Sequence, residues 1–125
     1  MHSVLIVDDD INLCTVLSEE LNEEGFNTTY VTSAAEAVEY MQKGNNVDLI
    51  LLDLKMPQHD GFFVLKNLKQ IGIDTKVIVL TAYADVRSAI DSARLGAIDF
   101  INKPYDLDEL IITMRKVLQK EENED

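Results

Sequence analysis

The chain contains a single cysteine, Cys14, so it cannot form an internal disulfide bond. A reducing, cytoplasmic location is the simplest interpretation of such sparse cysteine usage. We expect Cys14 itself to be a small buried residue of a helix. No apolar run is long enough to span a membrane, and the first residues lack the basic and apolar regions of a signal peptide. The sequence therefore predicts no membrane partner.

Basic side chains are also scarce. The chain has 11 Lys and Arg residues against 23 Asp and Glu residues, for a formal net charge of −12. Proteins that bind nucleic acid or anionic membranes derive affinity from basic patches, so the charge argues against direct binding to either. With 125 residues, 46% of them hydrophobic, the chain has room for one domain with a conventional core. We expect that domain at 1–120, followed by a fraying acidic tail at 121–125.

The chain does contain a regular alternation of short apolar runs and helical apolar spacing. This alternation predicts an α/β fold, with a five-stranded parallel sheet, helices on both faces and right-handed crossovers. Strand order 2-1-3-4-5 fits, with two helices on one face and three on the other. Four glycines each follow a helical stretch, as is usual just past a helix end. The expected strands are 3–7, 27–31, 48–52, 76–80 and 98–101, and those glycines are Gly25, Gly44, Gly72 and Gly96.

Apolar spacing also predicts which side of each helix faces the core. The fourth helix has a weak inward face that is rich in alanine. Ile112 falls off the apolar stripe of the last helix and is a candidate contact residue. The residues expected to face inward are Leu13, Val16, Leu17 and Leu21 in the first helix; Ala37, Val38 and Met41 in the second; Val64, Leu65 and Leu68 in the third; Val86, Ala89, Ile90 and Ala93 in the fourth; and Leu107, Leu110, Ile111, Met114, Val117 and Leu118 in the last.

Acidic residues directly follow two of the expected strands. Asp8, Asp9 and Asp10 come after the first, and Asp53 ends the apolar run 49–52. If these strands are parallel neighbours, their carboxyl ends meet where the strand order reverses, which is the usual ligand site of such a sheet. Three carboxylates placed that close repel one another unless a cation lies among them. Asp8, Asp9 and Asp53 therefore predict a divalent metal site and chemistry on an anionic group, and Asp10 is expected to cap the first helix.

Thr81 and Lys103 follow the fourth and fifth strands. A carboxylate such as that of Asp53 can attack phosphorus and form an acyl phosphate. Mg²⁺ is typically held by one or two carboxylates, waters and phosphate oxygens, and a hydroxyl and an ammonium can stabilise charge on the phosphoryl oxygens. Each residue alone has an ordinary explanation as a strand end, a cap or a turn. Their joint placement at successive strand ends predicts a phosphoryl-transfer site.

These motifs resemble the receiver domain of bacterial two-component and phosphorelay response regulators, over essentially the whole chain. The resemblance implies a flavodoxin-like (βα)₅ fold and Mg²⁺-dependent transfer of a phosphoryl group from phosphohistidine to Asp53. It implies that Asp8, Asp9 and the backbone carbonyl of Lys55 hold Mg²⁺ together with Asp53. The matching residues are Val4-Leu5-Ile6-Val7-Asp8-Asp9-Asp10, Asp53 with Met56-Pro57 and Asp60-Gly61, Thr81-Ala82, and Phe100 with Lys103-Pro104.

The resemblance also implies a switch. Thr81 and Lys103 would contact the phosphoryl group, and Phe100 would change rotamer as Thr81 moves. The resemblance further implies a cis bond between Lys103 and Pro104. The surface of the fourth helix, fifth strand and last helix would signal to a downstream effector protein or domain. Lys55 and Tyr83 would flank the route of attacking water, and we hypothesise that they slow hydrolysis of the acyl phosphate.

A histidine kinase or histidine phosphotransfer protein would be the phosphoryl donor. A chain of this kind catalyses only its own phosphorylation and dephosphorylation, so we do not expect an enzyme that acts on other substrates. One departure from the family pattern is Gln58, which stands where many relatives have glycine. Phosphorylation-dependent dimerisation stays open. So does the context: the start at Met1 favours a complete single-domain regulator over a receiver excised from a larger activator or hybrid kinase.

Three other functions fit less well. A phosphatase of the haloacid dehalogenase type needs a second Asp two residues after the nucleophile, where this chain has Lys55. A flavodoxin proper would bind FMN phosphate in the loop after the first strand, and here that loop is acidic and would repel phosphate. A pseudo-receiver would share the fold without the chemistry, whereas every chemical position of this chain is filled.

Overall fold

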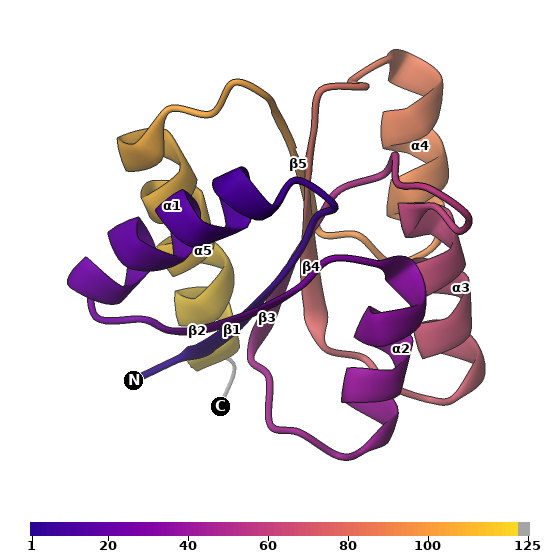
Figure 1. Ribbon diagram of the computed structural model, residues 1–125, viewed down its shortest axis with the longest axis horizontal. Coiled ribbons are helices and arrows are strands. Elements are labelled where there is room, and N and C mark those ends of the chain that lie inside the picture. The colour runs from indigo at the N-terminus through magenta and orange to yellow at the C-terminus, as the bar shows by residue number, and fades with distance from the viewer. Residues whose placement is uncertain (123–125) are drawn as a thin grey trace.

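A five-stranded parallel sheet lies between two layers of helices in the computed structural model, which describes residues 1–122 (Figure 1). The strand order is β2-β1-β3-β4-β5, as the alternation predicted. The strands are β1 (Ser3–Val7), β2 (Asn27–Val31), β3 (Leu49–Leu52), β4 (Lys76–Thr81) and β5 (Asp99–Asn102), and the helices are α1 (Ile11–Glu23), α2 (Ala34–Gln42), α3 (Gly61–Gln70), α4 (Val86–Arg94) and α5 (Leu107–Glu122).

The sheet separates two hydrophobic cores. Helices α1 and α5 cover one face, whereas α2, α3 and α4 cover the other (Figure 1). Alternate side chains of β1 pack into the two cores. Val4 and Ile6 lie on the α1–α5 side, and Leu5 and Val7 lie on the α2–α3 side. All residues of β3 are buried because helices cover this central strand on both faces. No helix among the described residues is long and apolar enough to cross a membrane.

Short polar side chains begin the helices. The side chain of Asp10 accepts hydrogen bonds from backbone amides of the first turn of α1, as expected from the sequence, and those of Ser33 and Asp106 do so for α2 and α5. Asp60 and Asp85 do the same for α3 and α4. The four glycines predicted at helix ends all have positive φ, which glycine adopts without a steric penalty. The predicted tail at 121–125 begins inside α5, which extends to Glu122. Residues 123–125 lie outside the described part of the chain, so fraying there stays a prediction.

The inward face of α1 differs from the expectation at one position. Val16 is 53% exposed, so the prediction that it faces the core is wrong. Cys14, Leu17 and Leu21 are the fully buried residues of this helix. Their spacing of three and four residues forms one stripe against β1 and α5, and it turns Val16 toward solvent. The burial of Cys14 confirms the expectation that it is a small buried residue of a helix.

The prediction that Val86, Ile90 and Ala93 of α4 face the core is wrong, because all three are exposed. Val86 is 76% exposed and Ile90 47% exposed, and Ala93 is exposed as well. Ser92 is instead the buried residue of this helix. Its hydroxyl donates to the carbonyl of Ala89 at 3.1 Å, so its burial leaves no polar group unpaired. The result is a helix that presents its large aliphatic side chains to the outside.

Candidate functional site

Two neighbouring strands place Asp8 and Asp53 side by side. Val7 of β1 pairs with Leu52 of β3, and the amide of Asp53 donates to the carbonyl of Val7 at 2.9 Å. Both aspartates follow immediately, so their side chains emerge at the same edge of the sheet. One carboxylate oxygen from each of Asp8, Asp9 and Asp53 lies within 4.8 Å of the others. Asp8 and Asp53 are buried and Asp9 is exposed.

Lys103 supplies the positive charge of this cluster. Its Nζ donates to Oδ2 of Asp8 at 2.6 Å and to Oδ2 of Asp53 at 3.4 Å. Its backbone amide donates to the carbonyl of Thr81 at 2.9 Å, which fixes the start of the β5–α5 loop to the end of β4. The Lys103–Pro104 bond is cis, as the resemblance implied.

Burial and their mutual contact both shift the pKa values of Asp8 and Lys103. Burial raises the pKa of Asp8 above its ordinary value, although hydrogen bonds from Lys103 and Asp10 act in the opposite direction. Burial alone would lower the pKa of Lys103, but the hydrogen bond and charge of Asp8, and then those of Asp53, raise it on balance. Lys103 is therefore a cation at neutral pH, and it pairs with two of the three carboxylates of the cluster.

Local hydrogen bonds orient the two buried carboxylates. Oδ1 of Asp8 accepts from the amide of Asp10 at 2.9 Å, and Oδ1 of Asp53 accepts from the amide of Lys55 at 3.4 Å. In each case the donor lies two residues further along the chain. The loop after each strand thus holds one oxygen, which leaves the second oxygen of each carboxylate toward Lys103.

Gly61 fixes the path of the chain after Asp53. Its amide donates to the carbonyl of Leu54 at 2.9 Å, so α3 begins directly against the end of β3. A Cβ atom at Gly61 would overlap the backbone carbonyl oxygen of Asp53 and lie 2.9 Å from Cα of Leu54. Asp60-Gly61 is among the residues that match the family pattern, but the sequence gave no sign of this close approach.

Thr81 ends β4, and Lys55 and Tyr83 lie in the loops that follow β3 and β4. The buried hydroxyl of Thr81 accepts from the amide of Tyr83 at 3.2 Å. The Nζ atom of Lys55 lies over the ring of Tyr83, 4.3 Å from its centroid, in a cation–π contact. This contact joins the β3–α3 loop to the β4–α4 loop. Phe100 is half-buried on β5 and is not among the residues that line the open pocket around the cluster.

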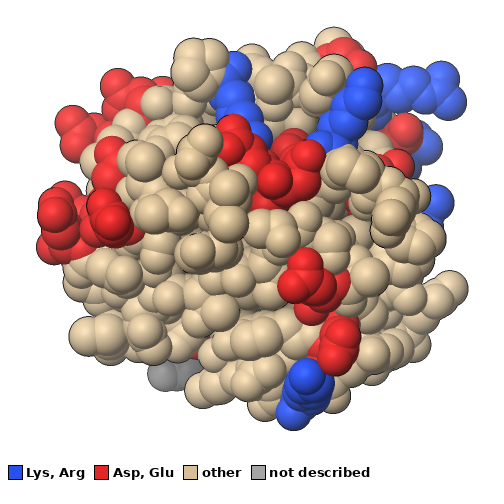
Figure 2. Space-filling model, viewed as in Figure 1, with Lys and Arg blue, Asp and Glu red and all other residues tan. Residues whose placement is uncertain are grey.

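An open pocket of about 500 Å³ contains the cluster. Figure 2 shows acidic side chains gathered near the upper edge of this face, where Figure 1 shows β1 ending, with basic side chains on both sides of them. Hard carboxylate oxygens at this spacing are the donors that Mg²⁺ prefers. The donor set therefore fits that ion. The lining residues are Asp8, Asp9, Asp10, Asp53, Lys55, Met56, Pro57, Ala82, Tyr83 and Lys103.

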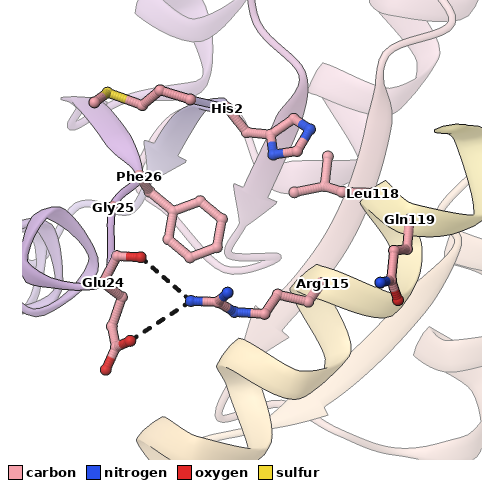
Figure 3. Close-up of a pocket in the computed structure, with 8 residues that line it drawn as sticks. His2, Glu24, Gly25, Phe26, Arg115, Leu118 and Gln119 are labelled. Atoms are coloured by element: carbon pink, nitrogen blue, oxygen red, sulfur yellow. Dashed lines mark hydrogen bonds and ion pairs between the residues drawn. The ribbon is translucent and has the colours of Figure 1, made fainter.

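A second pocket, of about 250 Å³, lies at the opposite end of the strands (Figure 3). Arg115 of α5 donates to the carbonyl of Glu24 at 3.2 Å, pairs with its carboxylate at 3.5 Å, and lies 5.5 Å from the ring centroid of Phe26. Glu24 already neutralises this guanidinium, and Glu24 is the one carboxylate among the lining residues. The contacts explain how α5 is anchored to the α1–β2 turn, and we assign them no chemistry.

Comparison with known proteins decides the family. The family model of the response regulator receiver domain matches residues 4–115. The chain belongs to this family. Receiver domains are the phosphoacceptor domains of response regulators, and the five parallel strands in order 2-1-3-4-5 with helices on both faces confirm the predicted flavodoxin-like fold.

Individual relatives agree. This receiver domain is 36% identical over 122 residues to sporulation initiation phosphotransferase F of Bacillus subtilis, a match that covers 98% of both chains. It is 36% identical over 115 residues to transcriptional regulatory protein ZraR of Escherichia coli, of which it spans only 26%. Among solved structures, response regulator protein TrrA of Thermotoga maritima in complex with Mg²⁺-BeF superposes with a TM-score of 0.84 and 35% identity, covering 94% of this chain and 100% of TrrA.

One contact near the site was not foreseen. The hydroxyl of Tyr105, two residues after Lys103, donates to Oε1 of Glu20 on α1 at 2.6 Å. The two residues are 85 positions apart, and neither belongs to a motif that the sequence singled out. Only the folded path of the β5–α5 loop brings them together.

Proposed function

We propose that this receiver domain takes a phosphoryl group from a histidine kinase or a histidine phosphotransfer protein onto Asp53. The observation that carries the proposal is the cluster of Asp8, Asp9 and Asp53 within 4.8 Å, bridged by Lys103. Asp53 is the member at the centre of the sheet, and Oδ2 of Asp53 points to the lysine. It is therefore the carboxylate best placed to receive a group whose negative charge Lys103 can balance.

In the proposed reaction a carboxylate oxygen of Asp53 bonds to phosphorus while the bond from phosphorus to the imidazole nitrogen breaks. The electron pair of that bond stays on the imidazole, and the product is an acyl phosphate. Asp8, Asp9, Asp53 and the backbone carbonyl of Lys55 would hold Mg²⁺, which when bound would offset negative charge on the phosphoryl oxygens. Lys103 would turn from Asp8 toward those oxygens.

Thr81 and Phe100 would convert the new charge into a change of shape. The hydroxyl of Thr81 accepts a hydrogen bond from Tyr83 and keeps its own proton to donate to a phosphoryl oxygen. We expect Phe100 to change rotamer as Thr81 moves, which would alter the α4–β5–α5 surface. Exposed Val86 and Ile90 on α4 and Ile112 on α5 give that surface the apolar side chains that an effector protein or domain could bury.

Lys55 and Tyr83 would prolong the phosphorylated form. Their cation–π contact joins two loops that line the pocket, where it would restrict the approach of water to the acyl phosphate. Tyr83→Ala should lose its phosphoryl group a few times faster than the parent, and Tyr83→Phe, which keeps the ring, should not. Equal half-lives of the parent and Tyr83→Ala phosphoproteins, measured by intact mass spectrometry, would rule out this role.

The deciding experiment uses a small phosphodonor. Parent protein, Asp53→Asn and Asp60→Asn are incubated with acetyl phosphate and MgCl₂, and phosphorylation is measured by intact mass spectrometry. We expect the parent and Asp60→Asn to gain one phosphoryl group, Asp53→Asn to gain none, and EDTA to prevent labelling. Asp60 is the matched control because it is a nearby aspartate that caps α3 outside the cluster. Labelling of Asp53→Asn to the parent level, or an unlabelled parent, contradicts the proposal.

The remaining assignments concern the context of the domain. We propose that residues 1–120 form the receiver, that 121–125 are a tail, and that the chain acts in the cytoplasm, where kinases use ATP. It would catalyse only its own phosphorylation and dephosphorylation, without contacting nucleic acid or membrane itself. Size-exclusion chromatography of the phosphorylated and unphosphorylated protein would show whether phosphorylation also produces a dimer.

A further inference from the structure

The β5–α5 loop is tied to α1 by the hydrogen bond between Tyr105 and Glu20. The donor–acceptor distance is 2.6 Å, short enough for a strong bond to a charged acceptor. The ring of Tyr105 packs against the core on the α1–α5 face together with Leu13 and Leu107. Burial, followed by the hydrogen bond and charge of Glu20, raises the pKa of the Tyr105 phenol, so the hydroxyl keeps its proton for this bond.

Only Pro104 separates Tyr105 from Lys103. The backbone of Lys103 is held on one side by its hydrogen bond to the carbonyl of Thr81. On the other side, Pro104 has no backbone N–H to donate. The next residue, Tyr105, makes a hydrogen bond to Glu20 on another element. The position of the Lys103 stem therefore depends on two anchors, Thr81 at the end of β4 and Glu20 on α1.

Glu20 is itself connected to the acidic cluster. It lies on the same helix that Asp10 caps, and the amide of Asp10 donates to Asp8. Asp8 in turn accepts from Nζ of Lys103. These contacts close a ring from Asp8 through Asp10, α1, Glu20 and Tyr105 back to Lys103. Removing one bond of a closed ring loosens every position that the ring fixes.

We propose that Tyr105 and Glu20 are positioning residues for phosphoryl transfer, which hold the ammonium of Lys103 between Asp8 and Asp53. The inference depends on the proposed function of Asp53. Neither side chain touches the cluster, so both act through Lys103. Tyr105→Phe deletes only the hydroxyl, and Glu20→Ala removes the acceptor. Glu20→Gln keeps an oxygen that can accept from the phenol and serves as the conservative control.

The test measures the rate of labelling at saturating MgCl₂. Acetyl phosphate is the phosphodonor, so that no partner protein contributes to the rate. Tyr105→Phe and Glu20→Ala should each be labelled about three to ten times more slowly than the parent, because a small displacement of a charge-stabilising group slows the reaction. The double variant should be no slower than either single variant, since one bond is lost in all three. Glu20→Gln should regain most of the rate.

A second background separates positioning from general loosening of the fold. In Lys103→Ala the substitution Tyr105→Phe should no longer change the labelling rate, because the group that it positions is gone. If the parent is labelled and Tyr105→Phe is labelled at the same rate, the positioning role is overturned and the proposed function of Asp53 stands. Equal slowing by Tyr105→Phe with and without Lys103 would overturn it as well. A parent that is not labelled at all would remove the proposed function and this inference together.

Discussion

Asp9 differs from the other two carboxylates of the cluster because, among the described residues, it has no ion-pair partner. Lys103 contacts Asp8 and Asp53, and Asp9 is exposed. In the absence of a divalent cation its charge is repelled by two neighbours and compensated by no direct contact. The repulsion between carboxylates at such a distance is worth about 1 kcal/mol in a well-hydrated site.

Replacing Asp9 by Asn should therefore stabilise the protein in EDTA. We expect the midpoint of thermal unfolding to rise by about 4 °C, the equivalent of about 1 kcal/mol for a domain of this size. Differential scanning calorimetry measures the change. Asp108→Asn, which removes an exposed charge from the first turn of α5, is the control and should not raise the midpoint, because an acid there favours the helix. An unchanged or lower midpoint for Asp9→Asn contradicts the repulsion.

Gln58 is a second residue whose local environment makes a prediction. It lies in the β3–α3 loop with φ of 70°, and it is the one described non-glycine residue with positive φ. The left-handed region costs an ordinary residue about 1–2 kcal/mol, and a β-branched side chain fits it worse. Glycine removes that cost but adds conformational entropy to the unfolded chain.

The free energy of unfolding in urea should therefore follow the order Gly, Gln, Val at position 58. Gln58→Gly should be stabilised by less than about 1 kcal/mol, and Gln58→Val should be destabilised by about 1–2 kcal/mol. His59→Val, one residue along the same loop without positive φ, is a control for the change of side chain alone. A valine at position 58 that leaves stability unchanged would show that the loop relaxes out of this conformation.

At the level of elements, α3 is the helix whose start controls the site. Gly61 allows its first turn to lie against the carbonyl of Asp53, where any larger residue would collide with backbone atoms. Backbone, unlike the end of a flexible side chain, cannot turn away. Gly61→Ala must therefore shift either α3 or the end of β3, and with it the carboxylate of Asp53.

Gly61→Ala should weaken Mg²⁺ binding and slow labelling by acetyl phosphate by at least about tenfold, because misplacement of reacting groups by an ångström is costly. Gly44→Ala is the matched control. Its φ of 80° makes alanine unfavourable, but no atom lies within 4 Å of the added Cβ. It should lose about 1 kcal/mol of stability and keep the affinity for Mg²⁺, measured by isothermal titration calorimetry. Equal Mg²⁺ affinities of the parent and Gly61→Ala would contradict the positioning by α3.

The elements also show what sequence patterns can predict. Strands β1 and β2 have the expected bounds because charged or polar residues interrupt their apolar or β-branched runs. Helical spacing predicted α2, α3 and α5 correctly since each has one clear apolar stripe. Helical spacing predicted the wrong inward face for α4. Its large aliphatic residues are exposed, and the buried residue is a serine whose hydroxyl is hydrogen-bonded within the helix.

The site divides in the same way. Asp8, Asp53 and Lys103 could be brought together from the sequence because the ends of parallel strands meet at one edge, whatever the detail of the loops. The contact between Tyr105 and Glu20 could not, because it depends on the course of a loop and on the side of a helix. Position at a strand end is a property of topology, whereas contact between side chains is a property of packing.

Over the whole molecule, charge is distributed unevenly. Residues 3–42, which form β1, α1, β2 and α2, contain nine acidic residues and no Lys or Arg. The acidic cluster begins in this segment, and Figure 2 shows further acidic side chains on the side where Figure 1 places α1. General repulsion over this part of the domain thus adds to the local repulsion at the cluster. The two contributions respond differently to ions. Screening by salt weakens both, whereas a cation bound at the cluster offsets only the local repulsion.

Thermal unfolding in NaCl and in MgCl₂ at equal ionic strength should separate them. NaCl at about 0.1 M reduces the Debye length to about 10 Å and should raise the midpoint of the parent modestly by screening the whole surface. MgCl₂ should raise it further, by the equivalent of about 1.4 kcal/mol when the ion is ten times above its dissociation constant, because binding favours the folded state. Asp9→Asn should keep the response to NaCl and lose most of the additional response to MgCl₂. If the parent responded equally to both salts at matched ionic strength, its acids would be acting only as a diffuse charge, and the cluster at the ends of β1 and β3 would hold no divalent ion.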